Sequence, residues 1–420
     1  MSKRVVVLGA GVIGMSVAQA CAEAGHGVTV LERLPRQRDG CSFGNAGMVV
    51  PSHFTPLATL GTLRLGLKWM WNAESPLYVR PRWDPDFFGW ILRFVLAANP
   101  VKVAQAEPVL RDFNVFSREV YGELARRGWD FGLREKGLLM LCRTQRGLEE
   151  EAHGAERARA LGLDAEVLDG AAVARLEPGA ALQVEGGVHY RGDRHLVPER
   201  FVRCLEEDAV ARGAALRFGV EVERWEFEGN RVRAVVTTGG DRVVAEEFVV
   251  CGGAWSDQVV RGLGLRMPMQ AGRGYSVTLP EPRQLPEVCS ILCEDRVAVT
   301  PMAGQLRVGG TMELAGKGQA LNPKRVAALS RAFVRYYPGF CERDFEGIQP
   351  WQGLRPCSPD GMPYLGRTGL WDNVVVATGH AMMGLSLAPG TGRVVASLVA
   401  RNASPIPLNL FQPDRFDGWL

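Results

Sequence analysis

The first strand-sized segment of the chain runs directly into a glycine-rich turn. Residues 5–8 are apolar and are followed by Gly9, Gly11 and Gly14. Glycines at this spacing allow a tight turn, a close approach of the backbone to a phosphate group and close packing of the next helix on the strand. A second strand then ends at Glu32, 18 positions after Gly14, where a carboxylate can accept both hydroxyls of a ribose. The segment therefore predicts a dinucleotide-binding βαβ unit, because a plain glycine turn would not need the acid.

Composition excludes several other classes of protein. The 49 lysines and arginines nearly balance the 46 acidic residues, and a net charge of +3 over 420 residues argues against nucleic acid as a partner. The nine cysteines are scattered without a Cys-x-x-Cys pair, which predicts a reducing compartment and neither structural disulfides nor a metal site. No run reaches the roughly 18 uncharged apolar residues of a spanning helix, and the glycine-broken opening does not resemble a signal peptide. We therefore expect a cytoplasmic protein with at most peripheral membrane contact.

Two later segments repeat the pattern of a strand that enters a glycine turn. One runs from Arg242 to Ser256 and reads as a single strand before its turn, and the other runs from Asn373 to His380. A segment of small residues at 41–47 follows the opening unit. We expect strands from three distant parts of the chain to join one sheet. This amount of chain favours a flavin dinucleotide over a nicotinamide cofactor, because the isoalloxazine ring must be held as well.

With these motifs, the sequence resembles the superfamily of glycine and D-amino-acid oxidases, which are FAD enzymes, and in particular the bacterial D-amino-acid dehydrogenases. The resemblance covers nearly the whole chain. Its motifs are Gly9 to Gly14 with Glu32, Ser42 to Gly47, His195 to Pro198, Gly272 to Thr278, Val308 to Glu313, Gly353 to Gly361, and Gly379, His380 and Gly384.

The resemblance implies an α/β fold of the mixed type with two interleaved domains. A Rossmann-like FAD-binding domain is expected from residues 1–52, 187–265 and 347–420. A substrate domain with a mixed or antiparallel sheet and helices is expected from residues 53–186 and 266–346. This interleaving predicts that neither half folds alone.

The resemblance also assigns cofactor roles to matching positions. Glu32 is expected to bind the adenosine ribose, Val222 to meet the adenine through its backbone, and residues 42–48 to line the flavin. The peptide groups at 384–386 are expected at a helix start that faces the flavin, where negative charge is stabilised. The complete set expected to contact FAD is Gly9, Gly11, Val12, Ile13, Gly14, Glu32, Arg33, Ser42, Asn45, Ala46, Gly47, Met48, Val222, Gly252, Gly253, Trp255, Gly353, His380, Gly384, Leu385 and Ser386.

The chain departs from its relatives at two places. Sarcosine-type relatives tether FAD through a cysteine, but the matching position here is Gly353, and Cys357 lies four residues away. We therefore expect FAD to be bound noncovalently. Some glycine oxidases carry a second arginine after the Gly-His pair, where this chain has Ala381, Met382 and Met383. This difference favours a substrate with a larger, more apolar side chain than glycine or sarcosine.

Arg355, Tyr275 and His53 are the candidates for substrate binding and catalysis. The resemblance implies that Arg355 binds the substrate carboxylate by planar bidentate pairing, although a surface salt bridge is the alternative. Tyr275 either binds the carboxylate or amine or is a half-buried tyrosine of a strand. His53 either enters the pocket or is solvated. Arg273 either adds positive charge or faces outward, and His380 either abuts the flavin or packs against its neighbours.

These features predict an FAD-dependent dehydrogenase that oxidises the Cα–N bond of a D-amino acid, with D-proline and D-hydroxyproline among the substrates considered. The resemblance implies that a hydride passes from Cα to flavin N5 and that a quinone or another non-oxygen acceptor then takes the electrons. Three alternatives stay open: an oxidase that uses oxygen, the catalytic subunit of a heteromeric opine or L-proline dehydrogenase, and a non-catalytic flavoprotein subunit. Either a homo-oligomer or a hetero-oligomer is compatible with these functions.

Two aromatic segments carry a further prediction. Leu63 to Trp71 and Phe87 to Phe94 combine Trp and Phe with Lys or Arg. Such a surface suits contact with a quinone or with a membrane interface, here the inner face of the cytoplasmic membrane. The alternative is that these segments pack over the substrate pocket or against a partner subunit.

Overall fold

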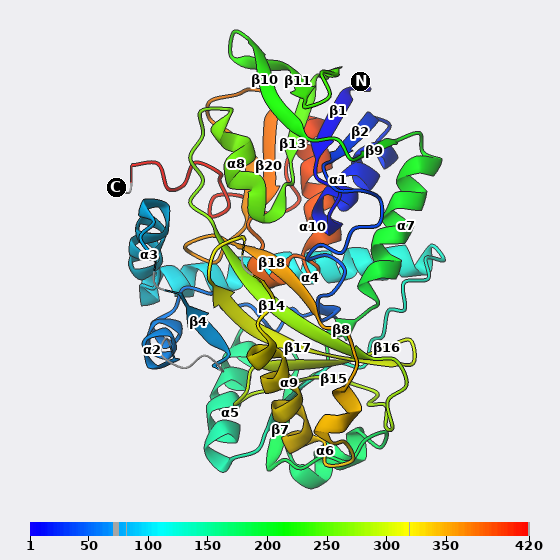
Figure 1. The fold of residues 1–420 in the computed structure, drawn as a ribbon, viewed down its shortest axis with the longest axis vertical. Helices are drawn as coiled ribbons and strands as arrows, with labels where there is room; N and C mark the ends of the chain where they lie inside the picture. Colours follow the sequence, from blue (N-terminus) through cyan, green and yellow to red (C-terminus); the bar gives the residue numbers. More distant parts are fainter. Residues whose placement is uncertain (70–74, 81, 319, 419–420) are drawn as a thin grey trace.

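Two large sheets make up the framework of the protein in the computed structural model, which describes residues 1–69, 75–80, 82–318 and 320–418. The six-stranded sheet occupies the upper half of Figure 1 and the nine-stranded sheet the lower half. Trp71, in one of the aromatic segments, lies outside the described residues.

The six-stranded sheet confirms that distant parts of the chain converge. The first, middle and last thirds of the chain each contribute parallel strands to this sheet. Among its six strands, only β19 runs antiparallel to its neighbour. In spatial order the strands are β19 (Tyr364–Arg367), β20 (Val374–Thr378), β13 (Glu247–Val250), β1 (Arg4–Leu8), β2 (Gly27–Glu32) and β9 (Ala215–Phe218).

Alternate residues of β1 face opposite sides of this sheet, as the period of a strand requires. Val5 and Val7 pack with the helices on one side, whereas Val6 and Leu8 pack with the elements on the other. The first side carries α1 (Val12–Glu23), α7 (Pro198–Ala211) and α10 (Ala388–Val399), and the second carries α8 (Ser256–Arg261) and a small sheet of β10 (Val222–Glu228), β11 (Arg231–Thr237) and β12 (Arg242–Val244). Both sides are therefore covered, which explains why the strands are almost entirely apolar.

The segment that was expected to be one strand from Arg242 into its glycine turn forms two strands in different sheets. β12 pairs with β11, whereas β13 begins at Glu247 and pairs with β1. The single-strand prediction was wrong because Glu246 turns toward the start of β1, where its amide donates to the carbonyl of Arg4.

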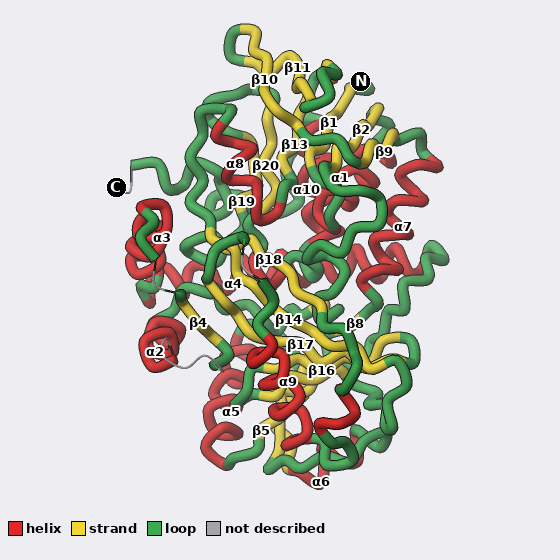
Figure 2. The backbone as a smooth tube through the Cα atoms, viewed as in Figure 1, coloured by secondary structure: helices red, strands yellow, loops and turns green. Residues whose placement is uncertain are grey.

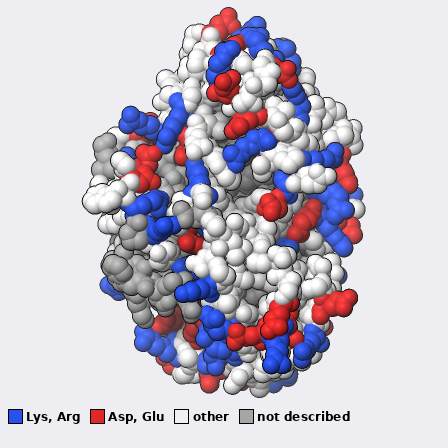
Figure 3. All heavy atoms as spheres, in the orientation of Figure 1, with Lys and Arg blue, Asp and Glu red and all other residues white. Residues whose placement is uncertain are grey.

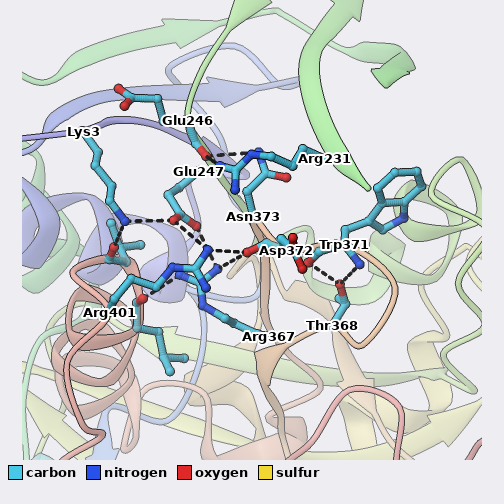
Figure 4. Close-up of polar contacts among 12 residues, drawn as sticks. Lys3, Arg231, Glu246, Glu247, Arg367, Thr368, Trp371, Asp372, Asn373 and Arg401 are labelled. Carbon is cyan, nitrogen blue, oxygen red and sulfur yellow. Dashed lines mark hydrogen bonds and ion pairs between the residues drawn. The ribbon is translucent and has the colours of Figure 1, made fainter. Parts of the chain in front are cut away.

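The buried carboxylate of Glu247 ties together one end of the six-stranded sheet (Figure 4). It forms ion pairs with Lys3 at 3.0 Å, Arg367 at 2.9 Å and Arg401 at 3.6 Å. Lys3 precedes β1, Glu247 begins β13 and Arg367 ends the antiparallel β19, so all three lie at the amino ends of the parallel strands. The glycine turns follow the opposite, carboxyl ends of these strands. The network therefore stabilises the sheet away from the predicted cofactor, and three cations offset the cost of burying one carboxylate.

The nine-stranded sheet is mixed, as predicted. Most neighbours are antiparallel, while β15 with β5 and β17 with β4 are parallel. The spatial order is β18 (Trp351–Cys357), β14 (Gln270–Leu279), β17 (Gln305–Leu314), β16 (Val297–Met302), β15 (Cys289–Leu292), β5 (Leu138–Cys142), β7 (Gly186–Tyr190) and β6 (Ala165–Asp169), with β4 (Leu77–Val79) beside β17. The helices α5 (Gln145–Ala160), α6 (Gly170–Leu176) and α9 (Pro323–Tyr336) pack around it.

The division into two domains stays a prediction, and strand pairing differs from it at two points. β7 and β18 fall in the segments expected to bind FAD, yet both pair within the nine-stranded sheet. β18 pairs with β14 over seven residues. This pairing places Arg355 on the outer strand of the nine-stranded sheet.

Further helices lie beside the two large sheets (Figure 1). α2 (Leu60–Trp69) and α3 (Pro85–Ala97) lie at one side, and α4 (Pro100–Arg126) crosses the middle of the molecule and packs against α10 (Figures 1 and 2). Asp84 caps α3 by accepting from the amides of Asp86 and Phe87. In the described ranges no single helix is long and apolar enough to cross a membrane, although α3 and α4, bent by 87°, pass that length and composition test as a pair.

Candidate active site

A cavity of about 560 Å³ lies where the two sheets meet. Its wall includes residues that end three parallel strands of the six-stranded sheet, among them Leu8, Glu32 and Thr378. The opposite wall includes Arg273 of β14 and Arg355 of β18. Ligands of open α/β sheets bind at the carboxyl ends of the strands, so this position agrees with the sequence-based prediction.

The glycine turn has the geometry that the motif predicts. Gly9 has a φ of +107°, and a Cβ there would lie 2.5 Å from the carbonyl oxygen of Cys251. A Cβ on Gly14 would overlap the carbonyl oxygen of Gly9. Gly11 caps α1, and Val12 and Ile13, the first residues of that helix, line the cavity. The turn therefore brings a helix start and bare backbone to the cavity, an arrangement suited to a pyrophosphate.

Glu32 lies at the end of β2, buried against the glycine turn. Its carboxylate accepts from the amide of Ala10 at 2.7 Å and from the amide of Leu34 at 2.9 Å, and the residue lines the cavity. Next to it, the guanidinium of Arg33 stacks over the ring of Trp255 at 4.0 Å. The acid thus holds the turn in place as well as facing the cavity. Its contact with a ribose stays a prediction.

The backbone of residues 42–48 is held by side chains of the nine-stranded sheet, which the sequence analysis did not identify. Ser276 donates to the carbonyl of Gly44 at 2.8 Å, and Thr300 donates to that of Ala46 at 2.7 Å. Arg307 donates to the carbonyls of Phe43 and Asn45 at 2.9 and 3.0 Å. Only strand pairing brings these side chains to the loop, so no local motif could have revealed them.

The residues of this loop divide into two groups. Ser42 and Asn45 line the cavity, and the hydroxyl of Ser42 accepts from the amide of Val12 at 2.8 Å. Ala46, Gly47 and Met48 are not part of the cavity wall that the structure describes. Met48 pairs with His195 where β3 (Met48–Val49) meets β8 (Arg194–His195), and a Cβ on Gly47 would overlap the carbonyl of Leu196. These three residues lie behind the wall because they anchor the loop.

The other expected cofactor contacts come mostly to the same cavity. Val222, Gly252, Gly253 and Trp255 line it, with Gly253 and Trp255 in the short helix η1 (Gly253–Trp255). Gly353, Gly384 and Leu385 line it as well. Ser386 does not line the described wall: it is buried, donates to Asn114 at 2.7 Å and accepts from the amide of Val50 at 3.0 Å. Residues 384–386 lie in a turn before α10, which begins only at Ala388, so they are not the helix start that was expected.

His380 lies at the cavity and also packs against its neighbours, while its contact with the flavin stays a prediction. Its ring lines the cavity and is 2% exposed, and Nε2 lies 3.1 Å from the hydroxyl of Thr391. Nδ1 is buried and has no hydrogen-bond partner among the described residues. Burial lowers the pKa of His380 to about 3, so the imidazole is neutral. Its unsatisfied nitrogen is a group that a bound cofactor can satisfy.

Arg355 and Arg273 line the cavity from neighbouring strands, with their side chains on opposite faces of the sheet, because Arg355 pairs with Gly272 and Arg273 pairs with Leu354. Nη1 of Arg355 donates to the carbonyl of Thr311 at 2.8 Å. Arg273 is buried rather than outward-facing, and it donates to the carbonyls of Ala320 and Lys317 at 2.9 and 3.3 Å. Lys317 also lines the cavity and forms an ion pair with Asp257 at 2.7 Å. Asp257 balances the charge of Lys317, so the guanidinium of Arg355 is the group of this wall that suits an anion.

Tyr275 and His53 do not join Arg355 in the described cavity wall. The hydroxyl of Tyr275 donates to Glu313 at 2.6 Å, and burial together with Glu313 raises the pKa of Tyr275 to about 12. This placement matches the alternative of a buried tyrosine in a strand. His53 contacts Ser52 at 3.1 Å, and burial and Arg296 lower its pKa to about 4. The three candidate catalytic residues are thus not brought together.

The residues around the cavity fit a flavin dinucleotide. A glycine cradle that any Cβ would block lies beside a carboxylate, and an unsatisfied imidazole nitrogen lies at the same cavity. Cys357 is fully buried and outside the described wall, whereas Cys41, which the sequence analysis did not single out, lies on it.

Comparisons with known proteins agree with this geometry. A family model described as FAD dependent oxidoreductase matches residues 4–398. The D-amino acid dehydrogenase of Methylobacterium nodulans is 34% identical over 414 residues, covering 96% of both chains, and that of Cereibacter sphaeroides strain ATCC 17029 is 36% identical, covering 96% of this chain and 93% of the relative. The crystal structure of glycine oxidase from Geobacillus kaustophilus shares the fold, with a TM-score of 0.78 at 24% identity over 99% of this chain and all of that one.

Proposed function

The chain belongs to the DAO family of FAD-dependent oxidoreductases, and from this membership and the geometry of the site we propose that it catalyses the oxidative deamination of D-amino acids. Bound FAD would supply the oxidising group, which takes up the two electrons of the Cα–H bond as that bond breaks and the Cα–N bond becomes a C=N bond. The imino acid product then hydrolyses to a 2-oxo acid and ammonia, whereas a cyclic substrate gives a ring imine.

One observation carries the substrate class. Arg355 lies on the wall of the same cavity that the glycine turn and Glu32 line. Its planar guanidinium suits bidentate pairing with a carboxylate. Carboxylate pairing fixes the position of Cα relative to the rest of the cavity, which is the main requirement of a reaction that depends on orientation.

Apolar residues also line the cavity in the segments of Arg355 and His380. Leu354, Ala381 and Met382 line the cavity next to Arg355 and His380. The neutral imidazole of His380 does not repel a substrate amine. A D-amino acid with an apolar side chain, D-proline included, is therefore the proposed substrate. Binding of FAD is proposed to be noncovalent, because Gly353 offers no thiol at the position of the tethering cysteine.

Arg355→Ala and Arg355→Lys test the proposal. Loss of a charged partner in a desolvated pocket costs about 3 kcal/mol, so kcat/KM for D-amino acids is expected to fall by about 100-fold or more in Arg355→Ala. Arg355→Lys keeps the charge but loses the planar fork and should recover only part of the activity. Arg146→Ala, at an exposed arginine of α5 that forms an ion pair with Glu150 in its own helix, is the matched control.

Anaerobic titration of the FAD-loaded protein provides the direct readout. Bleaching of the flavin by D-amino acids but not by L-amino acids supports the proposal, while unchanged kcat/KM in Arg355→Ala contradicts the role of Arg355. Acid precipitation should release the flavin into solution. Flavin that stays with the precipitated protein would overturn noncovalent binding and direct attention to Cys41.

The proposed electron acceptor is a quinone at a membrane surface, and α3 supports this choice. Phe88, Leu92, Val95 and Leu96 are 45–49% exposed on this helix, and the preceding Trp83 is 97% exposed. Uncharged atoms lie over α3 at the left edge of Figure 3. Aromatic and aliphatic side chains on one surface helix suit insertion into the interfacial region of a bilayer.

Vesicle binding tests this part of the proposal. The variant Phe88→Ser with Leu92→Ser removes two large exposed side chains and should reduce sedimentation with lipid vesicles, while soluble dye reduction with a D-amino acid stays unchanged. Phe227→Ser is the control, because Phe227 lies on the distant β10 and is 45% exposed, close to the exposure of Phe88. Equal vesicle binding by the α3 variant and the wild type would remove the membrane contact from the proposal. Rapid reoxidation of the reduced flavin by air would show that oxygen, and not a quinone, is the electron acceptor.

A further inference from the structure

Gly274 lies beside the guanidinium of Arg355 and the strained Thr311 accepts from it, and the proposed function gives neither residue a role. Gly272 and Gly274 belong to β14, the strand next to β18. Thr311 belongs to β17, on the other side of β14. The three residues lie in the two motifs at 272–278 and 308–313 that carry part of the family resemblance.

The pairing of β14 with β17 is interrupted at this point. The register shifts between Arg273 and Tyr275, so that Gly274 faces two residues of β17, Thr311 and Met312. This arrangement is a β-bulge, which redirects the backbone groups of the longer strand. At the same point β17 exchanges its other neighbour, from β16 to β4. The bulge is therefore built into the topology of the sheet.

Thr311 has two unfavourable features, a strained backbone and an unsatisfied hydroxyl. Its φ is +63°, in the left-handed region that a β-branched residue rarely adopts. Its hydroxyl is buried and has no hydrogen-bond partner among the described residues, although buried hydroxyls are normally satisfied. Strain of this kind persists where the surrounding structure imposes it, and it is concentrated at functional sites.

This conformation aims the carbonyl of Thr311 at Arg355, whose Nη1 donates to it at 2.8 Å. Arg355 pairs with Gly272 across the two strands, so its side chain must cross β14 to reach β17. A Cβ on Gly274 would overlap both terminal nitrogens of the guanidinium. Only a glycine at 274 leaves this path open.

We infer that the bulge of Gly274 and Thr311 is the positioning element of Arg355. Gly274 provides the space in which the guanidinium lies, and the carbonyl of Thr311 occupies one of its N–H groups. This contact fixes the plane of the fork and leaves the remaining donors for a carboxylate in the cavity. The inference rests on the proposed function, in which Arg355 binds the carboxylate of the substrate.

Binding of benzoate, a carboxylate without an amine, tests the inference separately from the proposed function. The FAD-loaded wild type, Arg355→Ala, Gly274→Ala and the double variant are titrated with benzoate by calorimetry, so no turnover is needed. We expect each single variant to raise the Kd for benzoate at least tenfold. The double variant should bind no more weakly than Arg355→Ala, since Gly274 acts through the arginine. Gly239→Ala, in an exposed turn with no atom nearer than 3.7 Å to the added Cβ, should match the wild type.

Each outcome decides between the inference and the proposed function. If Arg355→Ala binds benzoate like the wild type, the proposed role of Arg355 fails and the inference fails with it. If only Gly274→Ala binds like the wild type, or if the two effects add in the double variant, the inference alone is overturned. If Gly274→Ala does not fold, the double variant decides, because its methyl group enters the space that the guanidinium leaves. Recovery of folded, flavin-loaded double variant supports the contact, and its failure overturns the contact.

Discussion

The buried carboxylate of Asp193 predicts how the stability of the protein depends on pH. Asp193 lies between β7 and β8, is 2% exposed and accepts from the amide of Ser52 at 3.2 Å and from the Ser52 hydroxyl. It also lines a second cavity of about 360 Å³, together with Arg118. Burial raises the pKa of Asp193 from 3.8 to about 7, although the two contacts from Ser52 and the charge of Arg118 act in the opposite direction.

The sign and size of the effect follow from this shift. Between about pH 4 and pH 7 the native protein holds a proton on Asp193 that the unfolded chain has released, so the free energy of unfolding decreases as the pH rises. A shift of about three units corresponds to about 4 kcal/mol in total, of which about 3 kcal/mol is lost between pH 5 and pH 8.

Asp193→Asn isolates this contribution because asparagine is neutral in both states. The free energy of unfolding in urea is measured for both proteins, with saturating FAD, at several values between pH 5 and pH 8. The variant should gain about 3 kcal/mol relative to the wild type over this range, whatever their difference at pH 5. A difference that is constant with pH would refute the reasoning, since Asp193 would then be ionised throughout. Asp164→Asn, an exposed aspartate at the same cavity, should show no such change.

Three further predictions concern residues around the site. Glu32→Gln places an amide opposite the N–H groups of Ala10 and Leu34, so it should lower the free energy of unfolding by about 2 kcal/mol and reduce the flavin retained after gel filtration; undiminished flavin would contradict the ribose role. Arg307→Met removes the donor to the carbonyls of Phe43 and Asn45 and should destabilise the protein by about 3 kcal/mol in urea, with weaker FAD binding by fluorescence. Unchanged FAD affinity would show that the loop holds its shape without this arginine. Thr311→Gly removes a left-handed threonine and an unsatisfied hydroxyl while keeping the carbonyl, so the free energy of unfolding in urea should rise by about 1 kcal/mol, and a decrease would argue against strain at this position.

Short-range features of the chain were predictable because their physical causes are local. The apolar run at 5–8, the three glycines and Glu32 each act within one βαβ unit, and the structure places them as expected. The family and FAD were also predictable, and the comparisons confirm both. The mixed sheet was expected from the family resemblance, and strand pairing confirms it.

Side-chain placement across the two sheets was less accessible. Tyr275 alternates in its strand like any buried tyrosine, and only the register of β14 with β17 brings it to Glu313 instead of the cavity. Ala46, Gly47 and Met48 share a motif with Ser42 and Asn45, yet their contacts with other segments move them behind the wall.

The sequence by itself therefore determined the dinucleotide fold, the family and the cofactor, because short motifs and apolar periodicity encode them locally. The tertiary structure alone decided how Arg355 is held and how residues 42–48 are anchored. Arg355 depends on a gap at Gly274 and on a bulge at Thr311, 44 residues before it in the chain, and the loop depends on Arg307, more than 250 residues away. These contacts arise from the pairing of β14, β17 and β18, and no local pattern in the chain specifies that register.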